Sequence, residues 1–514
     1  MATPVQVTGA AILFAFYAIT ILFFVIRGSR KTKSINDYAL GSVSFSPFFV
    51  GLSLASSMTS AATFVINPGL VANFGISGYL SFGIVFPLAS MLSLVVMTKS
   101  FRKYGQSVKA VSLASWIRSR YESKGYGLFV ALLSFLLIAF IVLILVALAK
   151  VMSQALNADQ VVVLGVLTVF IFGYMMFGGA NSMVYTNMVQ ALVMIVVAFI
   201  LITSGVKFFN EGLGGFFDQL RSIDPLLISG TNPESPLFRN YIEIIIAQLI
   251  VGIAVVVQPH IITKSLLLKE EKDVNTFLVT AVGIQLLFYT VVIAGLYARL
   301  TFPDLTANGV TLNNDSIIPT YVMHAFSGGI FAVLAGLLVI LGLISAGFST
   351  VEGLIQSLST TLTSDLIKPL FGKNIKNENN YLLINKGVII MLAILSFFIA
   401  RDQLLHPKLS VAIFAQNGVY AYFSILFVPI LFGIFIKKIS LKVPLTASLV
   451  ALVSYYSVYY LFPYLLQKGL ADFGYFNIFM KDSVQNPAIA AATAIVMSLT
   501  VALILFVITP KKNT

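Results

Sequence analysis

Long apolar stretches alternate with short polar and charged segments along almost the whole chain. Each stretch has about 20 residues, the length that a helix needs to cross roughly 30 Å of hydrocarbon. Thirteen such stretches can be counted, and they cover residues 7–26, 45–66, 76–97, 126–150, 160–177, 183–206, 242–262, 275–299, 328–350, 382–400, 410–436, 443–465 and 488–508. The pattern predicts an all-α, polytopic membrane protein with about 13 transmembrane helices.

The composition excludes a water-soluble fold. Of the 514 residues, 58% are hydrophobic and only 10% are charged, whereas soluble proteins carry roughly a quarter charged residues. The net charge of +13 would suit a nucleic-acid partner, but the basic residues lie between apolar stretches and therefore indicate topology. Cysteine is absent, which excludes disulfides, thiol nucleophiles and cysteine metal sites.

The distribution of basic residues predicts the orientation. The first span is followed by Arg27, Arg30, Lys31 and Lys33, the reverse of the charge order in a cleavable signal peptide, so we expect this span to be retained. If the N-terminus lies outside, the inside segments carry 23 Lys and Arg residues and the outside segments carry eight. This asymmetry predicts an outside N-terminus and a cytoplasmic C-terminus, in a plasma membrane of the bacterial inner-membrane type.

Two spans contain features that interrupt a helix. Residues 53–63 form a small, hydroxyl-rich tract, and Gln258, Pro259 and His260 fall where the seventh span should continue. A proline removes one backbone hydrogen bond, and freed backbone groups persist at membrane depth only around a protein-enclosed or wet cavity. Tight helix packing is the alternative explanation of a single Ser/Thr run. Paired interruptions are the best sequence indication of a transporter's central site.

The interrupted spans begin two successive blocks of five spans. Because each block has an odd number of crossings, the second block must run inverted relative to the first. We therefore predict an extra N-terminal helix and loop (1–40), a first repeat (41–210), an external loop (211–240), a second repeat (241–437) and two C-terminal helices (438–514).

A hard cation such as sodium needs several oxygen ligands, and a broken helix supplies free carbonyl groups. The ninth span adds Ala346, Ser349 and Thr350, whose spacing places them on one helical face. Ordinary helix contacts also use such spacings.

Four stretches together resemble the sodium:solute symporter family, whose members carry proline, galactose, sialic acid, pantothenate or monocarboxylates. These stretches are Ala55-Ser-Ser-Met58, Gly178-Gly179 with Tyr185-Thr-Asn-Met-Val-Gln190, Gln258-Pro-His-Ile-Ile-Thr-Lys264, and Ser345-Ala-Gly-Phe-Ser-Thr350 running on to Asp365. The resemblance implies a LeuT-type core of five-plus-five inverted repeats, with one helix before it and two after it. It also implies alternating access, and a sodium site formed by backbone oxygens of Ala55, Met58 and Ala346 with the hydroxyls of Ser349 and Thr350.

A possible second cation site departs from the pattern of the family. Many family members have an aspartate where this chain has Asn187, and in some of them it helps to hold a second sodium ion. Glu352 lies in the ninth helix, two residues past Thr350, and is the only carboxylate clearly within a span when the boundaries are taken to within several residues. An intramembrane acid is a functional candidate by default, so Glu352 could neutralise a cation beside Asn187 or titrate as a proton site. The alternative is a structural acid bonded to hydroxyls or paired with an interfacial Lys.

The family's geometry implies that the solute lies beside the two breaks. The residues expected to face it are Ser57, Thr59, Ser60, Thr63, Gln258, His260, Gln285, Gln416 and Asn417. Sugar-carrying members have acidic and amide groups where this chain has Ala61, Ala62 and Ser81, so a hexose would lack partners. The positive dipole end of a half-helix N-terminus could receive the carboxylate of a solute without a dedicated arginine. A small organic anion or amino acid is therefore favoured, while His260 could instead be a helix-break residue bonded to backbone.

Rival functions fit less well. No H-E-x-x-H or phosphate-binding G-x-x-x-x-G-K-[ST] motif occurs, and three histidines without cysteine argue against an enzyme. A proton-coupled symporter using Glu352, a transporter-like solute sensor and a passive channel remain as alternatives. The expected partners are a small solute, Na+ as coupling ion and the lipid bilayer, with no cofactor and no nucleic acid; the sequence leaves the oligomeric state open.

Overall fold

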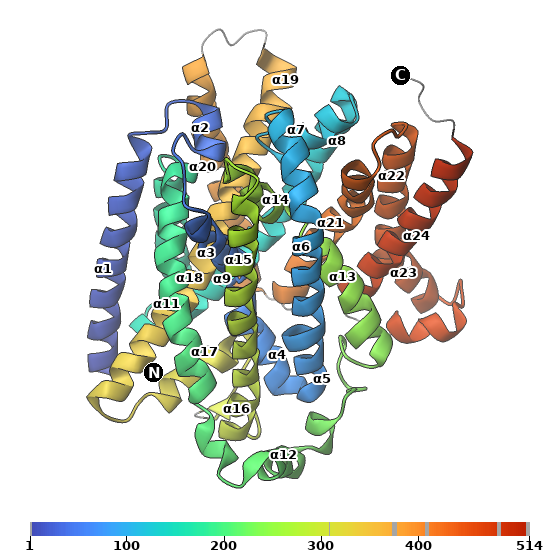
Figure 1. Ribbon diagram of the computed structural model, residues 1–514. Coiled ribbons are helices and arrows are strands. Elements are labelled where there is room, and N and C mark those ends of the chain that lie inside the picture. Colours follow the sequence, from blue (N-terminus) through green and yellow to red (C-terminus); the bar gives the residue numbers. More distant parts are fainter. Residues whose placement is uncertain (1–2, 308, 373–377, 407–410, 481–484, 510–514) are drawn as a thin grey trace.

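The structure is a computed structural model that describes residues 3–307, 309–372, 378–406, 411–480 and 485–509. Helices run between an upper and a lower face, with α1 (Pro4–Ser29) rising from the lower face and α24 (Pro487–Ile508) ending at the upper one (Figure 1). The two ends of the described chain thus lie on opposite faces, as an odd number of crossings requires.

The first half of the chain contains helices that are almost continuous with one another. They are α2 (Ile35–Leu40), α3 (Pro47–Met58), η1 (Ala62–Ile66), α4 (Asn67–Phe74), α5 (Ile76–Tyr79), η2 (Leu80–Val85), α6 (Phe86–Ser107), α7 (Leu113–Arg120), α8 (Lys124–Leu133), η3 (Ser134–Leu137), α9 (Ile138–Leu156), α10 (Gln160–Met175), α11 (Ala180–Thr203), η4 (Val206–Phe209), α12 (Gly212–Ile223) and η5 (Pro225–Ile228).

The second half continues in the same way, with one short hairpin of two antiparallel strands. Its elements are η6 (Ile242–Ala247), α13 (Gln248–Val255), α14 (Pro259–Ile262), η7 (Thr263–Leu267), α15 (Asp273–Thr290), η8 (Val291–Ile293), α16 (Ala294–Thr301), β1 (Thr306–Ala307), β2 (Val310–Thr311), α17 (Asn314–Ala325), α18 (Gly329–Thr361), η9 (Leu362–Ile367), α19 (Lys368–Phe371), α20 (Glu378–Leu405), α21 (Val411–Phe435), α22 (Lys442–Tyr456), η11 (Ser457–Leu461), α23 (Phe462–Gln467) and η12 (Gly474–Phe479).

The predicted spans correspond to helices one by one. Among the described residues, 10 continuous helical stretches are long and apolar enough to cross a membrane, and two bent pairs bring the total to 12. The apolar helix Gln160–Met175 is shorter and accounts for the remaining predicted span. The all-α membrane architecture is therefore confirmed.

The main error in the boundaries concerns the ninth span, which was predicted to end at Thr350. The helix α18 continues to Thr361, and all of its last turns are buried. The polar side chains that resemble the end of a span in the sequence are instead accommodated inside the protein. Glu352 consequently lies well within a helix, with its side chain excluded from the surface.

Both predicted interruptions are present. The pair α3 and η1–α4 bends by 53° and the pair η6–α13 and α14–η7 bends by 55°. At the first break Thr59 leaves helical geometry (φ −110°, ψ 88°), and at the second Gln258 does so (φ −57°, ψ 135°) just before Pro259. The extended residue before proline is the expected consequence of steric clash with the ring.

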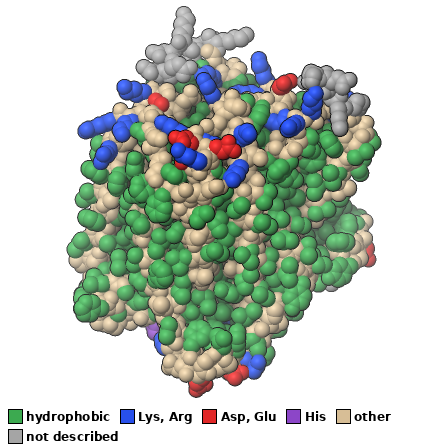
Figure 2. Space-filling view, viewed as in Figure 1, with side chains coloured by type: hydrophobic (Ala, Val, Ile, Leu, Met, Phe, Trp, Pro, Cys, Tyr) green, Lys and Arg blue, Asp and Glu red, His purple; other side chains and the backbone are tan. Residues whose placement is uncertain are grey.

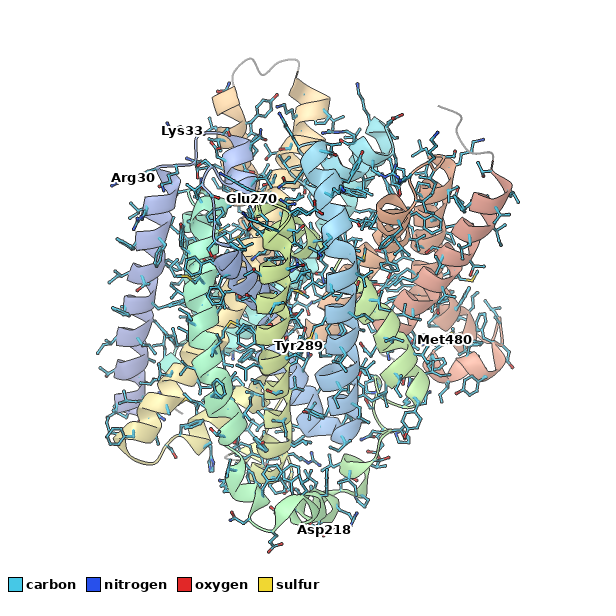
Figure 3. All side chains as sticks on the ribbon, viewed as in Figure 1. Arg30, Lys33, Asp218, Glu270, Tyr289 and Met480 are labelled. Carbon is cyan, nitrogen blue, oxygen red and sulfur yellow. The ribbon has the colours of Figure 1, made fainter. Side chains whose placement is uncertain are left out.

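The surface agrees with a membrane protein. Figure 2 shows a wide band of hydrophobic side chains, with most of the visible Lys and Arg gathered on the upper face, where Arg30 and Lys33 also lie (Figure 3). Of the basic residues counted from the sequence, Lys373, Lys376, Lys408, Lys481, Lys511 and Lys512 lie outside the described residues. Lys264, which the count of basic residues includes in the inside segment 264–273, is only 3% exposed.

Candidate solute and cation sites

The two breaks border one cavity in the middle of the bundle. The space not filled by atoms there, including space open to solvent, is about 780 Å³. Its walls come from both broken spans and from α6, α9, α15 and α21, and Tyr289, which is one of its lining residues, lies at mid-height (Figure 3). Charged side chains are absent from its lining among the described residues.

Several predicted solute residues line this cavity. They are Ser57, Ser60, Thr63, Gln258, His260 and Gln416. The Gln258 Oε1 and His260 Nδ1 atoms are buried without a hydrogen-bond partner. Because unpaired buried polar groups are costly, these atoms are available to a polar solute. The His260 ring lies edge-on to Phe140, with the ring centroids 6.1 Å apart.

Three predicted solute residues lie elsewhere. Thr59 and Gln285 are buried and do not belong to the lining of the cavity, and both carry unpaired polar atoms. Asn417 faces the C-terminal helices, where its Nδ2 donates to the Tyr460 hydroxyl over 2.5 Å and its Oδ1 accepts from the Tyr455 hydroxyl over 3.1 Å. Successive residues of an α-helix point about 100° apart around its axis, which explains why Gln416 reaches the cavity and Asn417 does not.

Sequence reasoning missed much of the cavity wall. Asn67, Tyr289 and Tyr420 add polar groups, while Phe82, Phe86 and Phe140 add apolar surface. These residues come from six helical elements, which are α4, η2, α6, α9, α15 and α21. Sequence periodicity predicts the buried face of each helix but not which of these faces meet.

The predicted sodium ligands lie where α3 ends. Because α3 stops at Met58, the carbonyl groups at positions 55–58 lack their usual donors four residues further on, and among them the Ser56 carbonyl accepts instead from the Thr59 N–H over 3.2 Å. The Ser349 hydroxyl donates to the Ser56 carbonyl over 2.8 Å, and the Thr350 hydroxyl donates to the Ser57 carbonyl over 3.0 Å. Both hydroxyls also donate to the carbonyl of Ala346. Ala55 and Met58 flank the two accepting residues in the same turn.

Glu352 lies in a pocket of hydrogen-bond donors. Its Oε1 accepts from the Tyr174 hydroxyl over 2.6 Å and from Gln190 Nε2 over 2.9 Å, while its Oε2 accepts from the Thr186 hydroxyl over 2.6 Å. Tyr174 is on α10, and Thr186 and Gln190 share one face of α11. An ionised carboxylate only accepts hydrogen bonds, so this surrounding suits the charged form.

Asn187 lies between Glu352 and a cation that the sequence did not reveal. In the amide orientation that satisfies its neighbours, Asn187 donates to Glu352 Oε2 over 3.1 Å and accepts from Lys264 Nζ over 2.9 Å. Amide orientation is assigned from such networks. The Lys264 ammonium also donates to the Ser53 carbonyl over 2.6 Å and to the Ser53 hydroxyl over 2.8 Å. The sequence signal that could have drawn attention to Lys264 is its position at the end of the Gln-Pro-His stretch.

A model of the sodium:solute symporter family matches residues 38–450, which is well over half of the chain. The chain belongs to the sodium:solute symporter family. It is therefore a membrane transporter and not an enzyme, with sodium and a small solute as its partners. The family prediction from the four motifs is confirmed.

Named relatives carry different solutes. The chain is 26% identical over 451 residues to the sodium/pantothenate symporter of Escherichia coli (strain K12), covering 85% of this chain and 88% of the relative. It is 22% identical over 392 residues to an osmoregulated proline transporter of Bacillus subtilis (strain 168), covering 75% and 76%.

Solved structures agree with the predicted core. A Na+-coupled sialic acid symporter in a substrate-bound, outward-open state matches with a TM-score of 0.76 at 17% identity, over 98% of both chains. A manganese transporter mutant of Eremococcus coleocola matches with a TM-score of 0.52 at 14% identity, over 92% of this chain and 99% of that one. These likenesses concern the fold, and the LeuT-type prediction is confirmed.

Proposed function

We propose that this chain is a sodium-driven importer of a small carboxylate-bearing solute, and that it works by alternating access. The observation that carries the proposal is the meeting of two broken spans at one central cavity, next to the hydroxyl pair of Ser349 and Thr350. Such breaks expose carbonyl groups to a cation and half-helix N-termini to an anion.

The proposed sodium ligands are the backbone oxygens of Ala55, Met58 and Ala346 and the hydroxyls of Ser349 and Thr350. Support comes from the end of α3, where carbonyl groups are freed from helical pairing, and from the two hydroxyls that already contact this turn. All five residues offer neutral oxygen atoms, which suit a hard monovalent ion. The site joins α3 to α18, so an ion bound there would hold the two helices together.

The proposed solute class follows from the cavity wall and from the relatives. Pantothenate and proline both carry a carboxylate. The wall holds neutral polar groups such as Gln258, His260 and Gln416 beside large apolar surfaces. The second half of the first broken span begins at the cavity with Ala62, and a helix start favours negative charge. A compact anion with an apolar body matches this combination.

The proposed orientation places the basic upper face of Figure 2 in the cytoplasm. This puts α12, where Asp218 lies in Figure 3, on the outside. The positive-inside tendency supports that assignment, and the chain would then reside in a plasma membrane with its N-terminus outside and its C-terminus inside.

The test is uptake of labelled proline, pantothenate, acetate, pyruvate, galactose and sialate into proteoliposomes, with an inward sodium gradient or with choline in its place. We expect sodium-dependent accumulation of one of the carboxylates. Accumulation driven by a proton gradient without sodium would favour the proton-coupled alternative. Equilibration without accumulation would indicate a passive channel, and binding without uptake a sensor; each of these results contradicts the proposal.

A further inference from the structure

We propose that the Lys264 ammonium is a built-in cation that fills the second cation site of this transporter, so that no second sodium ion binds there. The inference rests on the proposed sodium coupling and deepens it, because it fixes which of two possible ion sites is open to sodium. It would make the chain a carrier that uses only the site at Ser349 and Thr350.

The surroundings of Lys264 consist of oxygen atoms arranged as around a bound cation. The ammonium contacts the Ser53 carbonyl at 2.6 Å, the Ser53 hydroxyl at 2.8 Å, the Asn187 amide oxygen at 2.9 Å and the Ser57 hydroxyl. These four oxygen contacts outnumber the three hydrogens that an ammonium can donate. Carbonyl, amide and hydroxyl oxygens are also the neutral ligands that a hard ion accepts.

The charge of Lys264 is balanced by Glu352. Both side chains are buried, at 3% and 0% exposure, and the Asn187 amide connects them by accepting from the ammonium and donating to the carboxylate. A buried charge needs a partner. Asn187 is neutral, so Glu352 is the acidic group of this cluster, and one ammonium compensates it fully.

A sodium ion could not share the site. Two unit positive charges about 4 Å apart repel strongly enough, at an effective dielectric constant of about 20, to weaken binding on the order of a thousandfold. The ammonium also uses the oxygen atoms that a sodium ion would need. Removing the side chain beyond Cβ should therefore leave both a space and an uncompensated carboxylate, which together make a sodium site.

The experiment measures saturation binding of radioactive sodium to the purified full-length chain in detergent. We expect Lys264→Ala to bind one sodium ion more than wild type. Lys269→Ala is the matched control, because Lys269 is an exposed lysine five residues further on, and it should bind as many ions as wild type. The double variant Lys264→Ala with Glu352→Gln should lose the additional ion, because the attracting carboxylate is gone.

The inference is judged from the difference between Lys264→Ala and wild type, and the proposed function from wild type alone. An unchanged number of ions in Lys264→Ala overturns the inference, as does wild-type binding of a second ion that Ser349→Ala with Thr350→Ala leaves in place. Wild-type binding of no sodium contradicts the proposed function, while a gain of one ion in Lys264→Ala would still support the inference.

Thermal unfolding covers the case in which Lys264→Ala is too unstable to purify in low salt. Sodium should raise the unfolding temperature of this variant more than choline does, and more than it raises that of wild type, because sodium replaces the missing ammonium. A variant that stays unfolded in sodium, or that is equally stable in sodium and choline, overturns the inference.

Discussion

The Ser57 hydroxyl lies 3.1 Å from the Ser349 carbonyl oxygen and donates to it. Ser57 also accepts a hydrogen bond from Lys264, lines the central cavity and offers its carbonyl to the Thr350 hydroxyl. One residue at the end of α3 thus contacts the cavity and both candidate cation sites. Any rotation of α3 relative to α18 must alter these three environments together, which gives a direct route for coupling ion binding to solute binding.

The double change Ser349→Ala with Thr350→Ala should weaken sodium binding by about 100-fold or more, because each of the two hydroxyl contacts to a charged group contributes about 1.5–3 kcal/mol. Radioactive sodium binding to the purified protein measures the loss. Thr168→Ala is the control, since it removes a buried hydroxyl that bonds only its own helix at Leu164. Undiminished sodium affinity in the double variant would mean that the ion binds elsewhere.

Gln258→Leu should raise the solute concentration for half-maximal uptake by about tenfold, with little change in the sodium concentration required. The reason is that Gln258 lines the cavity with a free oxygen, and a polar contact to solute contributes on the order of 1 kcal/mol or more. Gln285→Leu serves for comparison, because Gln285 is buried outside the lining. A larger effect on sodium than on solute would show that Gln258 does not face the solute.

Glu352→Gln should destabilise the protein by about 3–5 kcal/mol, the usual result of leaving one buried charge without its partner. Thermal unfolding in detergent measures the effect. Adding Lys264→Met should recover much of the stability, because the second change removes the charge that the first left unpaired. If the two changes are simply additive, Glu352 and Lys264 do not act as a pair.

Glu243→Gln should also lower stability by about 3–5 kcal/mol. Glu243 is fully buried, pairs with Arg239 over 2.6 Å and accepts from Asn486 over 3.1 Å, so it fastens the start of the seventh span to α24. The control is Asp218→Asn, which breaks the exposed pair with Arg221 and should change stability by about 1 kcal/mol or less. Comparable losses of stability in Glu243→Gln and Asp218→Asn would mean that the buried pair of Glu243 and Arg239 stabilises the protein no more than an exposed pair does.

The sequence by itself determined the elements that the bilayer dictates. Hydrocarbon excludes unpaired backbone groups and charges, so every span had to appear as an apolar run, and each interruption had to appear as a proline or a hydroxyl-rich tract. The breaks at Thr59 and Gln258 follow from local chemistry and were predictable. The hydroxyl pair Ser349 and Thr350 was recognisable because a helix places neighbouring residues on one face.

Only the tertiary structure decided which polar groups meet. Lys264 resembles a loop charge in the sequence, yet it is buried because Ser53 and Asn187, from helices far away in the chain, supply its acceptors. Glu352 is held by Tyr174 and Thr186, which lie 178 and 166 residues before it. A buried charge is tolerated only through such distant partners, and local periodicity contains no information about them.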